Sequence, residues 1–360
     1  MKYRSIVFIV LTGWILAACG SMDGLSGAAG VPTATASPAP TSTPEAATLI
    51  PPPGGHILFV SDREGERNLF LMDASGANPL RLIAMPIDAE PRLSPDGARI
   101  AFVSTVNDNT DIYLANADGS GIVRITDDPA KDSAPAWAPD GMRLAFESYR
   151  NGNFDIFVVN ADGSGLAPLT DDAAGDSNPQ WAPAGDHIAF VSNRGGNSDI
   201  WMIRPDGSGL TRLTNDPPPT SDPAWSPDGS RIAYRTSSTE DSHEVCIMNA
   251  DGSNARCLTE FAKVGIPSWS KDGISLAYTA THNSVTGIDI LNTGDSTFQS
   301  LIFDVEPRSD PLWAMEDPYL VFQGKNANGD MEIYLVTVPS GDLLLLTLYS
   351  GFDGFPIWAR

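Results

Sequence analysis

The chain has 360 residues, with 45 acidic and 22 basic side chains, and its formal net charge at pH 7 is −23. A chain this acidic lacks the basic surface that displaces counterions from a phosphate backbone, so we expect no nucleic-acid partner. The charge favours solubility and, where it serves recognition, a cationic partner. The alternative, that the acidity serves solubility alone, stays open.

The first residues have the pattern of an export signal. Lys2 and Arg4 precede an apolar stretch, residues 6–16, that is short for a membrane span. The quartet Leu16-Ala17-Ala18-Cys19 follows and resembles the bacterial lipobox. We therefore predict a lipoprotein signal peptide over residues 1–18 and a lipid-modified Cys19, with an ordinary secretory signal as the alternative. The protein is then expected outside the cytoplasm, lipid-anchored to a bacterial membrane on its periplasmic or cell-surface face.

Residues 19–54 contain almost no large apolar side chains and are rich in Ala, Gly, Ser, Thr and Pro. Such a segment cannot bury enough surface to offset its ordering entropy, and its prolines favour extended conformations. We predict a disordered tether. Its Thr, Ser and Pro content leaves a glycosylated stalk open as an alternative to a plain spacer.

From about residue 55 to the C-terminus the chain repeats one phrase: Pro, a variable residue, Trp, a small residue, then Pro-Asp-Gly. The clearest copies are at 135–141 and 223–229. Weaker copies begin at Pro91, Pro179, Pro267, Pro311 and Pro356. Successive copies are 44 or 45 residues apart, and this regularity indicates a repeat protein.

Each repeat carries short apolar runs separated by turn residues. After the first Pro-Asp-Gly turn these runs are 99–104, 111–116 and 122–126. They are rich in Ile, Val, Phe, Tyr and Thr and bounded by Gly, Pro, Asn and Asp, which predicts strands rather than helices. With the Pro-x-Trp segment, each unit is a four-stranded meander. Radial packing protects the edges of such units, so the sequence predicts an all-β β-propeller.

The number of blades follows from the termini. Residues 56–83 carry three of the four strands of a unit, with no Pro-x-Trp segment before them. The missing strand is at 356–359, at the other end of the chain. Six complete units and this split one predict a seven-bladed propeller of four-stranded blades, closed by N- and C-terminal strands in one blade.

The repeat resembles that of a known family. Trp-Ser-Pro-Asp-Gly-x-Arg-Ile-Ala, then Ser-Asn-Arg, Asp-Ile-Trp-Met, Asn-Ala-Asp-Gly-Ser-Gly and Arg-Leu-Thr, resembles the repeats of TolB-like propellers, also called WD-like, over residues 55–360. The Gly-His and Trp-Asp signatures of ordinary WD40 repeats are absent. The resemblance implies a propeller more firmly than a function, because prolyl-oligopeptidase-type enzymes share the blade. The chain ends with the last predicted strand, so we expect no hydrolase domain and no protease activity.

TolB itself, which these repeats resemble, works in envelope protein complexes and carries a separate N-terminal α/β domain. In this chain the predicted tether stands in that place. The resemblance therefore implies a propeller of the cell envelope but does not carry over the partners of TolB.

Two cysteines follow Cys19. Cys246 and Cys257 flank the hairpin turn 249–254 symmetrically, so in a simple hairpin they lie opposite each other on neighbouring strands. In an oxidising compartment this spacing predicts a cross-strand disulfide. An unpaired structural thiol is the alternative.

Acidic and basic residues also recur together. An Asp three positions before the repeat proline occurs with an Arg after the second strand in three blades. Because they are present together or absent together in six of the seven blades, with Asp88 the exception, we predict structural ion pairs rather than binding residues. The pairs are Asp132 with Arg150, Asp176 with Arg194, and Asp353 with Arg63.

In resembling propellers the loops entering the first strand and leaving the second lie on one face, around the central channel. Here these loops are crowded with carboxylates, which can hold a cation or a basic peptide. A solvated loop surface is the alternative. The binding candidates are Asp127, Asp128, Asp171, Asp172, Asp216 and, as the one basic residue at the acidic positions, Arg308. No cofactor is predicted, and calcium is left open.

Motifs that carry chemistry are scarce. The four histidines fall in different blades, and no zinc helix, nucleophile elbow or phosphate-binding loop occurs. The repeated Asp-Gly-Ser-Gly segments fit hairpin turns better than calcium loops. We therefore predict a monomeric, membrane-anchored module that binds an envelope protein or a basic peptide segment. A propeller enzyme of the lactonase, lyase or glycosidase type, with a metal or carboxylates in the channel, is the alternative.

Overall fold

The computed structural model describes residues 54–359 except 90, 216–217, 240–241, 261–262, 302 and 315–317. The predicted signal peptide, Cys19, the tether up to residue 53, and Asp216 lie outside the described residues. Every regular element in the described part is a β-strand. No helix there is long and apolar enough to cross a membrane.

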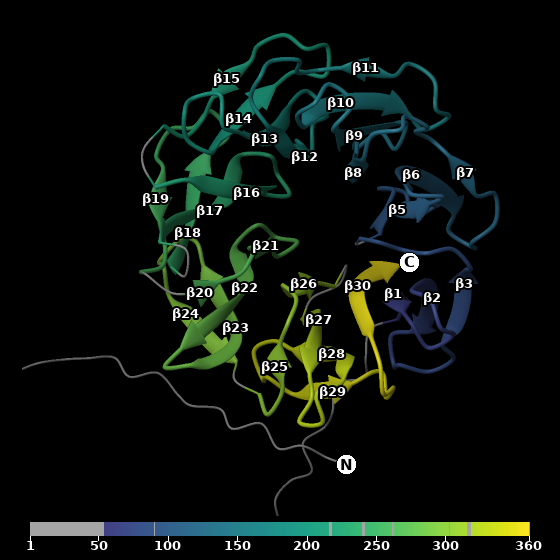
Figure 1. The fold of residues 1–360 in the computed structure, drawn as a ribbon. Coiled ribbons are helices and arrows are strands. Elements are labelled where there is room, and N and C mark those ends of the chain that lie inside the picture. The colour runs from purple at the N-terminus through teal and green to yellow at the C-terminus, as the bar shows by residue number, and fades with distance from the viewer. Residues whose placement is uncertain are drawn as a thin grey trace, which may run out of the picture. The chain divides into compact units, whose positions relative to one another are not determined.

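The strands form seven antiparallel sheets arranged in a ring, as predicted (Figure 1). Blade 1 comprises β30 (Asp353–Ala359), β1 (His56–Ser61), β2 (Asn68–Asp73) and β3 (Leu80–Ile83). Blade 2 comprises β4 (Arg92–Leu93), β5 (Arg99–Val106), β6 (Asn109–Asn116) and β7 (Val123–Arg124). Blade 3 comprises β8 (Asp132–Trp137), β9 (Arg143–Ser148), β10 (Asp155–Asn160) and β11 (Ala167–Pro168).

The next two blades repeat the same plan. Blade 4 comprises β12 (Asp176–Trp181), β13 (Ile188–Ser192), β14 (Asp199–Ile203) and β15 (Thr211–Arg212). Blade 5 comprises β16 (Thr220–Trp225), β17 (Arg231–Thr239), β18 (Ser242–Asn249) and β19 (Arg256–Cys257). In each blade the first strand of the repeat is innermost and the fourth is at the rim (Figure 1).

In blades 6 and 7 the innermost strand is interrupted, so two short segments pair with one second strand. Blade 6 comprises β20 (Lys263–Val264), β21 (Ser268–Trp269), β22 (Ser275–His282), β23 (Val285–Asn292) and β24 (Phe298–Leu301). Blade 7 comprises β25 (Glu306–Pro307), β26 (Leu312–Trp313), β27 (Tyr319–Lys325), β28 (Met331–Thr337) and β29 (Leu343–Leu345). The four-stranded plan is kept in both.

The two ends of the propeller close the ring in blade 1. There the sheet order is β3-β2-β1-β30, and the register pairs His56 with Ala359, and Ile57 with Trp358. The predicted closure by N- and C-terminal strands is therefore confirmed.

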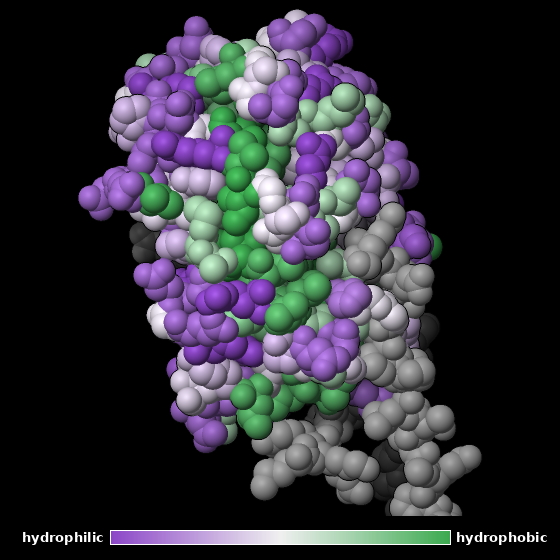
Figure 2. All heavy atoms as spheres, turned by 90° about the vertical axis from the view of Figure 1, so that its right-hand side faces the viewer, coloured by the Kyte–Doolittle hydropathy of each residue, from purple (hydrophilic) through white to green (hydrophobic). Residues whose placement is uncertain are grey.

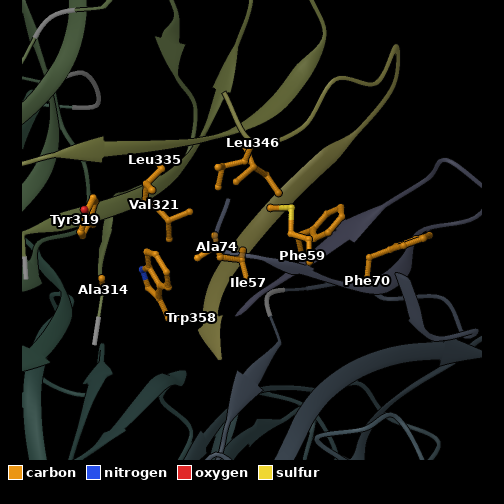
Figure 3. Packing of buried hydrophobic residues seen from close by; sticks show 12 residues of the cluster. Ile57, Phe59, Phe70, Ala74, Ala314, Tyr319, Val321, Leu335, Leu346 and Trp358 are labelled. Carbon is orange, nitrogen blue, oxygen red and sulfur yellow. The ribbon is translucent and has the colours of Figure 1, made fainter. Parts of the chain in front are cut away.

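The hydrophobic core is divided among the blade junctions. The described residues form seven clusters of buried apolar side chains, and each joins two neighbouring blades. Figure 3 shows the one at the closure, where Phe59 and Trp358 of blade 1 pack with Val321 and Leu335 of blade 7. Because each sheet buries both faces against its neighbours, no blade has a core of its own.

The Trp of the repeat phrase explains part of this packing. Trp137 in blade 3 donates from Nε1 to the carbonyl oxygen of Arg92 in blade 2, at 3.0 Å. The same bond joins Trp225 to Gln180, Trp269 to Ala224 and Trp313 to Ser268. Each of these indoles thus fastens the innermost strand of one blade to that of the blade before it.

Replacing Trp137 with Phe is expected to lower the free energy of unfolding by about 1 kcal/mol more than the same change at Trp181. Both rings lie under an arginine, at 5.0 Å for Arg99 and 4.9 Å for Arg143. The Trp181 indole nitrogen, however, has no hydrogen-bond partner among the described residues. Urea unfolding of the two variants therefore isolates the hydrogen bond, and equal losses would show that it contributes nothing.

The neighbouring blade crowds the Asp-Gly turn between β6 and β7. Asp118 accepts hydrogen bonds at Oδ1 from the Ser120 amide (2.9 Å) and hydroxyl (2.6 Å), which confirms a hairpin turn. Gly119 has a φ of +81°, and a Cβ there would lie 2.3 Å from the carbonyl oxygen of Leu82 in blade 1. Only glycine fits this close approach.

Apolar side chains also form a band on the side of the ring that Figure 2 shows. Leu80 on β3 and Val123 on β7 are 64% and 54% exposed. Four of the outermost strands, β7, β11, β15 and β19, contain only two residues each. Edges this short offer little backbone for pairing with another chain.

Candidate functional site on the channel face

One face of the ring gathers two kinds of loop from each blade. Because Asp132 at the start of β8 is in register with Ser148 at the end of β9, the loop entering β8 and the tip leaving β9 lie at the same edge. We call the face formed by these loops the channel face. Its loops are tied together between blades: Asn153 from the tip of blade 3 donates to the carbonyl oxygens of Asp172 (3.0 Å) and Ala174 (2.5 Å) in the next loop.

The structure places each Asp of the three predicted ion pairs against its Arg. Arg150 Nη2 lies 3.2 and 3.1 Å from the two carboxylate oxygens of Asp132. The corresponding distance to Oδ2 is 2.5 Å for Arg194 and Asp176, and 2.8 Å for Arg63 and Asp353. All three aspartates are fully buried.

Each arginine is also held by its own blade. Arg150 donates from Nε to the Ser148 hydroxyl at 2.7 Å, and its guanidinium lies 4.5 Å from the ring centre of Phe157. The Ser-x-Arg spacing, which brings the hydroxyl under the guanidinium, recurs at Ser61 and Ser192. These contacts fix the arginine where the first strand begins and indicate a structural role.

Blade 6 uses a different pair at this place. His282 stands at the arginine position, and its Nε2 lies 2.8 Å from Asp289 Oδ2. Asp289 belongs to the third strand, not to the loop entering the first, and it also accepts the Ser300 hydroxyl at 2.6 Å. Val264 stands where blades 1, 3 and 4 have the strand-one Asp, so in blade 6 the acidic partner comes from the third strand instead.

The acidic binding candidates fall into two groups. Asp128 accepts the amide of Ala130 at 2.9 Å, which closes its own loop. Asp172 accepts the amide of Ala174 at 2.7 Å and lies 2.9 Å from Arg194 Nη1. Their neighbours Asp127 and Asp171 are exposed, and neither has a hydrogen bond or ion pair to another described residue.

The basic candidate lies in another sector of the channel face. Arg308 is exposed and pairs with the exposed Glu306 at 2.6 Å. Beside this pair is a shallow hollow of about 400 Å³ between the loop entering blade 7 and the tip leaving β27. Its lining includes Asp304, Glu306, Lys325 and residues 326–329. The structure therefore brings Arg308 together with an acid of its own loop and does not join it to the acidic candidates of blades 3 and 4.

A polar network that the sequence analysis did not identify joins the first and second strands of blades 3 to 5. Glu147 accepts the amide of Asn178 at 3.1 Å, and Asn178 donates from Nδ2 to Asp222 at 3.3 Å. Arg235 donates to Asp222 from Nε at 2.8 Å and from Nη2 at 2.6 Å. Asn178 and Asp222 have φ values of 54° and 55°, a left-handed conformation that Asn and Asp tolerate.

The sequence analysis also did not identify a set of buried acids near the start of the third strands. They are Asp111, Asp155, Asp199 and Glu332, and each is at most 1% exposed. Arg124 Nη2 lies 2.6 Å from Asp111, and Arg212 Nη2 lies 2.5 Å from Asp199. The sequence does contain a pattern that marks three of them. Asp111, Asp155 and Asp199 stand 44 residues apart, each directly before an apolar run.

Two of these acids have no arginine partner. Burial raises the pKa of Asp155, and the charges of Asp176 and Asp172 raise it further, while hydrogen bonds from Asn151 and Thr170 lower it. Burial likewise raises the pKa of Glu332, against hydrogen bonds from the Thr347 hydroxyl and the Tyr349 amide. Both carboxyls therefore lie in an environment that disfavours their charge.

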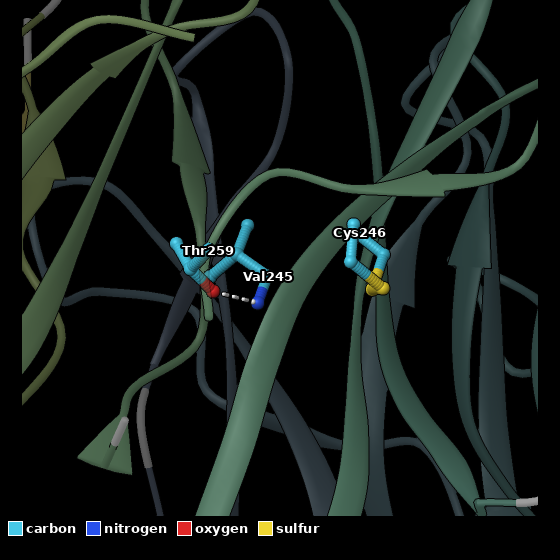
Figure 4. Close-up of a disulfide and its surroundings, with 4 residues drawn as sticks. Val245, Cys246 and Thr259 are labelled. Carbon is cyan, nitrogen blue, oxygen red and sulfur yellow. Dashed lines mark hydrogen bonds between the residues drawn. A yellow bond between two sulfur atoms is a disulfide. The ribbon is translucent and has the colours of Figure 1, made fainter. Parts of the chain in front are cut away.

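The remaining cysteines lie on neighbouring strands of blade 5. Cys246 on β18 is in register with Cys257 on β19, and a disulfide joins them across a Cα distance of 3.8 Å (Figure 4). Beside it, the Val245 amide donates to the Thr259 hydroxyl at 2.9 Å. Within the described residues, the only three His, Cys, Asp or Glu ligand atoms within 4.8 Å of one another belong to Glu244 and these two cysteines. The disulfide occupies both sulfurs, so this group is not a preformed metal centre.

A ring of seven meander blades, closed by its two terminal strands, defines a β-propeller protein. Residues 90–314, more than half of the chain, match the TolB β-propeller domain family. The chain therefore belongs to the TolB β-propeller family. No curated protein sequence matches it.

Solved structures agree with this fold. TolB from Acinetobacter baumannii superposes with a TM-score of 0.58 at 23% identity, over 72% of this chain and 66% of that one. An oligogalacturonate lyase from Vibrio parahaemolyticus has a TM-score of 0.67 at 16% identity, over 79% and 87%. The propeller domain of a trilobed protease from Pyrococcus furiosus has a TM-score of 0.61 at 16% identity, over 83% and 96%. This chain thus spans just under two thirds of that TolB, and at these identities the likeness concerns the fold alone.

Proposed function

We propose that this protein is a membrane-anchored propeller that binds a protein or a basic peptide segment in the cell envelope through its channel face. The observation that carries the proposal is that the carboxylates of Asp127 and Asp171 are exposed and unpaired within the described part of the chain. They occupy the same position in the loops entering blades 3 and 4, are exposed, and have no partner among the described residues. Their neighbours Asp128 and Asp172 are held by hydrogen bonds.

The two unpaired carboxylates lie on adjacent loops, so their negative charges add to one local electrostatic potential. Because the protein is strongly acidic and these two charges are not neutralised within the fold, they attract cationic side chains and favour a basic partner. The neighbouring hydrogen bonds keep the loops in one conformation, so little ordering entropy is lost on binding.

The proposed location rests on three independent features. The lipobox-like quartet before Cys19 supports a lipid anchor. The disulfide between Cys246 and Cys257 fits an oxidising compartment. Membership of the TolB propeller family fits a place outside the cytoplasm.

The double variant Asp127→Asn/Asp171→Asn is expected to weaken partner binding about fivefold, because each exposed charge pair contributes roughly 0.5 kcal/mol. The partner is first captured from envelope extract with the full chain as bait, and its dissociation constant is then titrated at low and high salt. High salt should reduce the difference between the variant and the parent protein.

A matched control removes two charges from the opposite edge of the blades. Asp118→Asn/Asp162→Asn alters the turns between the third and fourth strands, where Asn is also tolerated. This control is expected to bind like the parent. Equal binding by both double variants, or equal loss in both, would reject the channel-face site.

A further inference from the structure

Two junctions between blades bury more negative than positive charge. At the junction of blades 3 and 4, Asp155 starts β10 and Asp176 starts β12, and both are fully buried. The Asp176 amide donates to the carbonyl oxygen of Phe154 at 2.7 Å, so the two acids lie side by side across the junction. Arg194 engages Asp176 Oδ2, but Asp176 Oδ1 has no hydrogen-bond partner among the residues that the structure describes.

The junction of blades 7 and 1 repeats this arrangement. Glu332 on β28 and Asp353 on β30 are fully buried. The residues just before them, Met331 and Phe352, form a parallel bridge, which places the two acids next to each other. Arg63 engages Asp353 Oδ2, and within the described part of the chain Asp353 Oδ1 has no hydrogen-bond partner.

Blades 2 and 4 neutralise the strand-three acid with an arginine on the fourth strand. Arg124 is in register with Tyr113 in blade 2, and Arg212 with Trp201 in blade 4, and each lies within 2.6 Å of its acid. The residues at the equivalent register are Pro168 in blade 3 and Leu345 in blade 7. The arginine is therefore replaced by an uncharged residue at both of these junctions. In blade 2 Asp111 Oδ2 also lacks a hydrogen bond, but it lies 2.6 Å from Arg124 Nη2.

The charge of these junctions and the type of their ligand atoms indicate which kind of ion would fit them. Around Asp155, two buried carboxylates (Asp155, Asp176) face one guanidinium (Arg194), which leaves a net charge of −1 when both are ionised, and the partly exposed Asp172 adds a further negative charge at the edge. An uncompensated buried charge is costly, and a cation held in such a junction would offset that cost. The donors are all oxygens, namely carboxylates with the hydroxyl of Thr170 or Thr347 close by, which suits hard cations rather than zinc or copper.

We propose that the junction of blades 3 and 4 and the junction of blades 7 and 1 each bind one calcium-class cation between the strand-three acid and the strand-one aspartate. Calcium accepts six to eight oxygen ligands in flexible geometry and takes water for those that the protein does not supply. Two carboxylates per junction are therefore sufficient to anchor it. The cation then neutralises the strand-three acid, as Arg124 and Arg212 do in blades 2 and 4.

The test is calcium binding by the full chain after treatment with a chelator. Equilibrium dialysis is expected to find two ions per chain, and saturating calcium is expected to raise the melting temperature by roughly 5 °C. Asp155→Asn or Glu332→Gln should each reduce the stoichiometry to one ion, and the double variant should bind none. The control Asp199→Asn, at an acid already paired with Arg212, should still bind two.

A second pair of variants supplies the missing arginines. Pro168→Arg and Leu345→Arg copy the arrangement of blades 2 and 4 and should abolish calcium binding while leaving the protein folded. The proposal is overturned if the parent binds no calcium, or if the double variant Asp155→Asn/Glu332→Gln binds as much as the parent. A melting temperature that rises on acidification but not with calcium would show instead that each junction holds a proton, and would also overturn it.

Discussion

Deletion of residues 353–359, the whole of β30, is expected to abolish cooperative unfolding of the propeller. The deletion removes Trp358, which packs in the cluster between blades 1 and 7, and leaves β1 as an unpaired edge. Loss of a buried Trp alone costs about 3–5 kcal/mol, against a total stability of roughly 5–15 kcal/mol for a typical domain. Thermal unfolding followed by circular dichroism measures the effect.

The matched control deletes only residue 360, which lies beyond β30. That protein should unfold cooperatively at the melting temperature of the parent. If the chain without β30 also melts cooperatively near that temperature, the terminal strand does not hold the ring closed.

Replacing Arg150 with Ala is expected to lower the free energy of unfolding by about 3–5 kcal/mol. The reason is asymmetric burial: Asp132 is fully buried, while the Arg150 side chain is 14% exposed. Without the guanidinium, a carboxylate remains inside the blade with no compensating charge. Urea unfolding at neutral pH measures the loss.

Two comparisons make this result specific. Arg308→Ala breaks an exposed pair with Glu306, whose side chains are 43% and 50% exposed, and should change stability by less than about 1 kcal/mol. Adding Asp132→Asn to Arg150→Ala removes the stranded charge and should restore part of the stability. Equal stabilities of the parent and Arg150→Ala would show that the pair is not structural.

The architecture was predictable because it rests on turn chemistry repeated many times. Pro-Asp-Gly and Asp-Gly-Ser-Gly fix the chain reversals, and their period of 44 residues counts the blades. The first unit lacks its Pro-x-Trp strand, and this strand stands at the C-terminus instead. This arrangement predicts from the sequence alone that the two termini close the ring. The proximity of Asp132 and Arg150 could also be predicted, because residues that are present or absent together in a repeat usually share a place in the fold.

The site could be predicted only in outline. Asp127 and Asp128 are identical in type and adjacent in sequence, and only the loop conformation shows that Asp128 closes a turn while Asp127 is unpartnered. The burial of Asp155 depends on the next blade, which covers the start of the third strand. The sequence of one repeat does not show which residues of the next blade pack against it. Sequence patterns alone therefore do not reveal that two acids are buried together at this junction.

The position of β1 has a mechanical consequence. β1 carries the chain into the propeller at His56, yet it lies inside its sheet, with β2 on one side and β30 on the other. Any tension on the chain ahead of His56 therefore acts along a strand held in shear by two rows of hydrogen bonds. A pull from that end is resisted by a whole blade, whereas a strand at the rim could be peeled away one bond at a time.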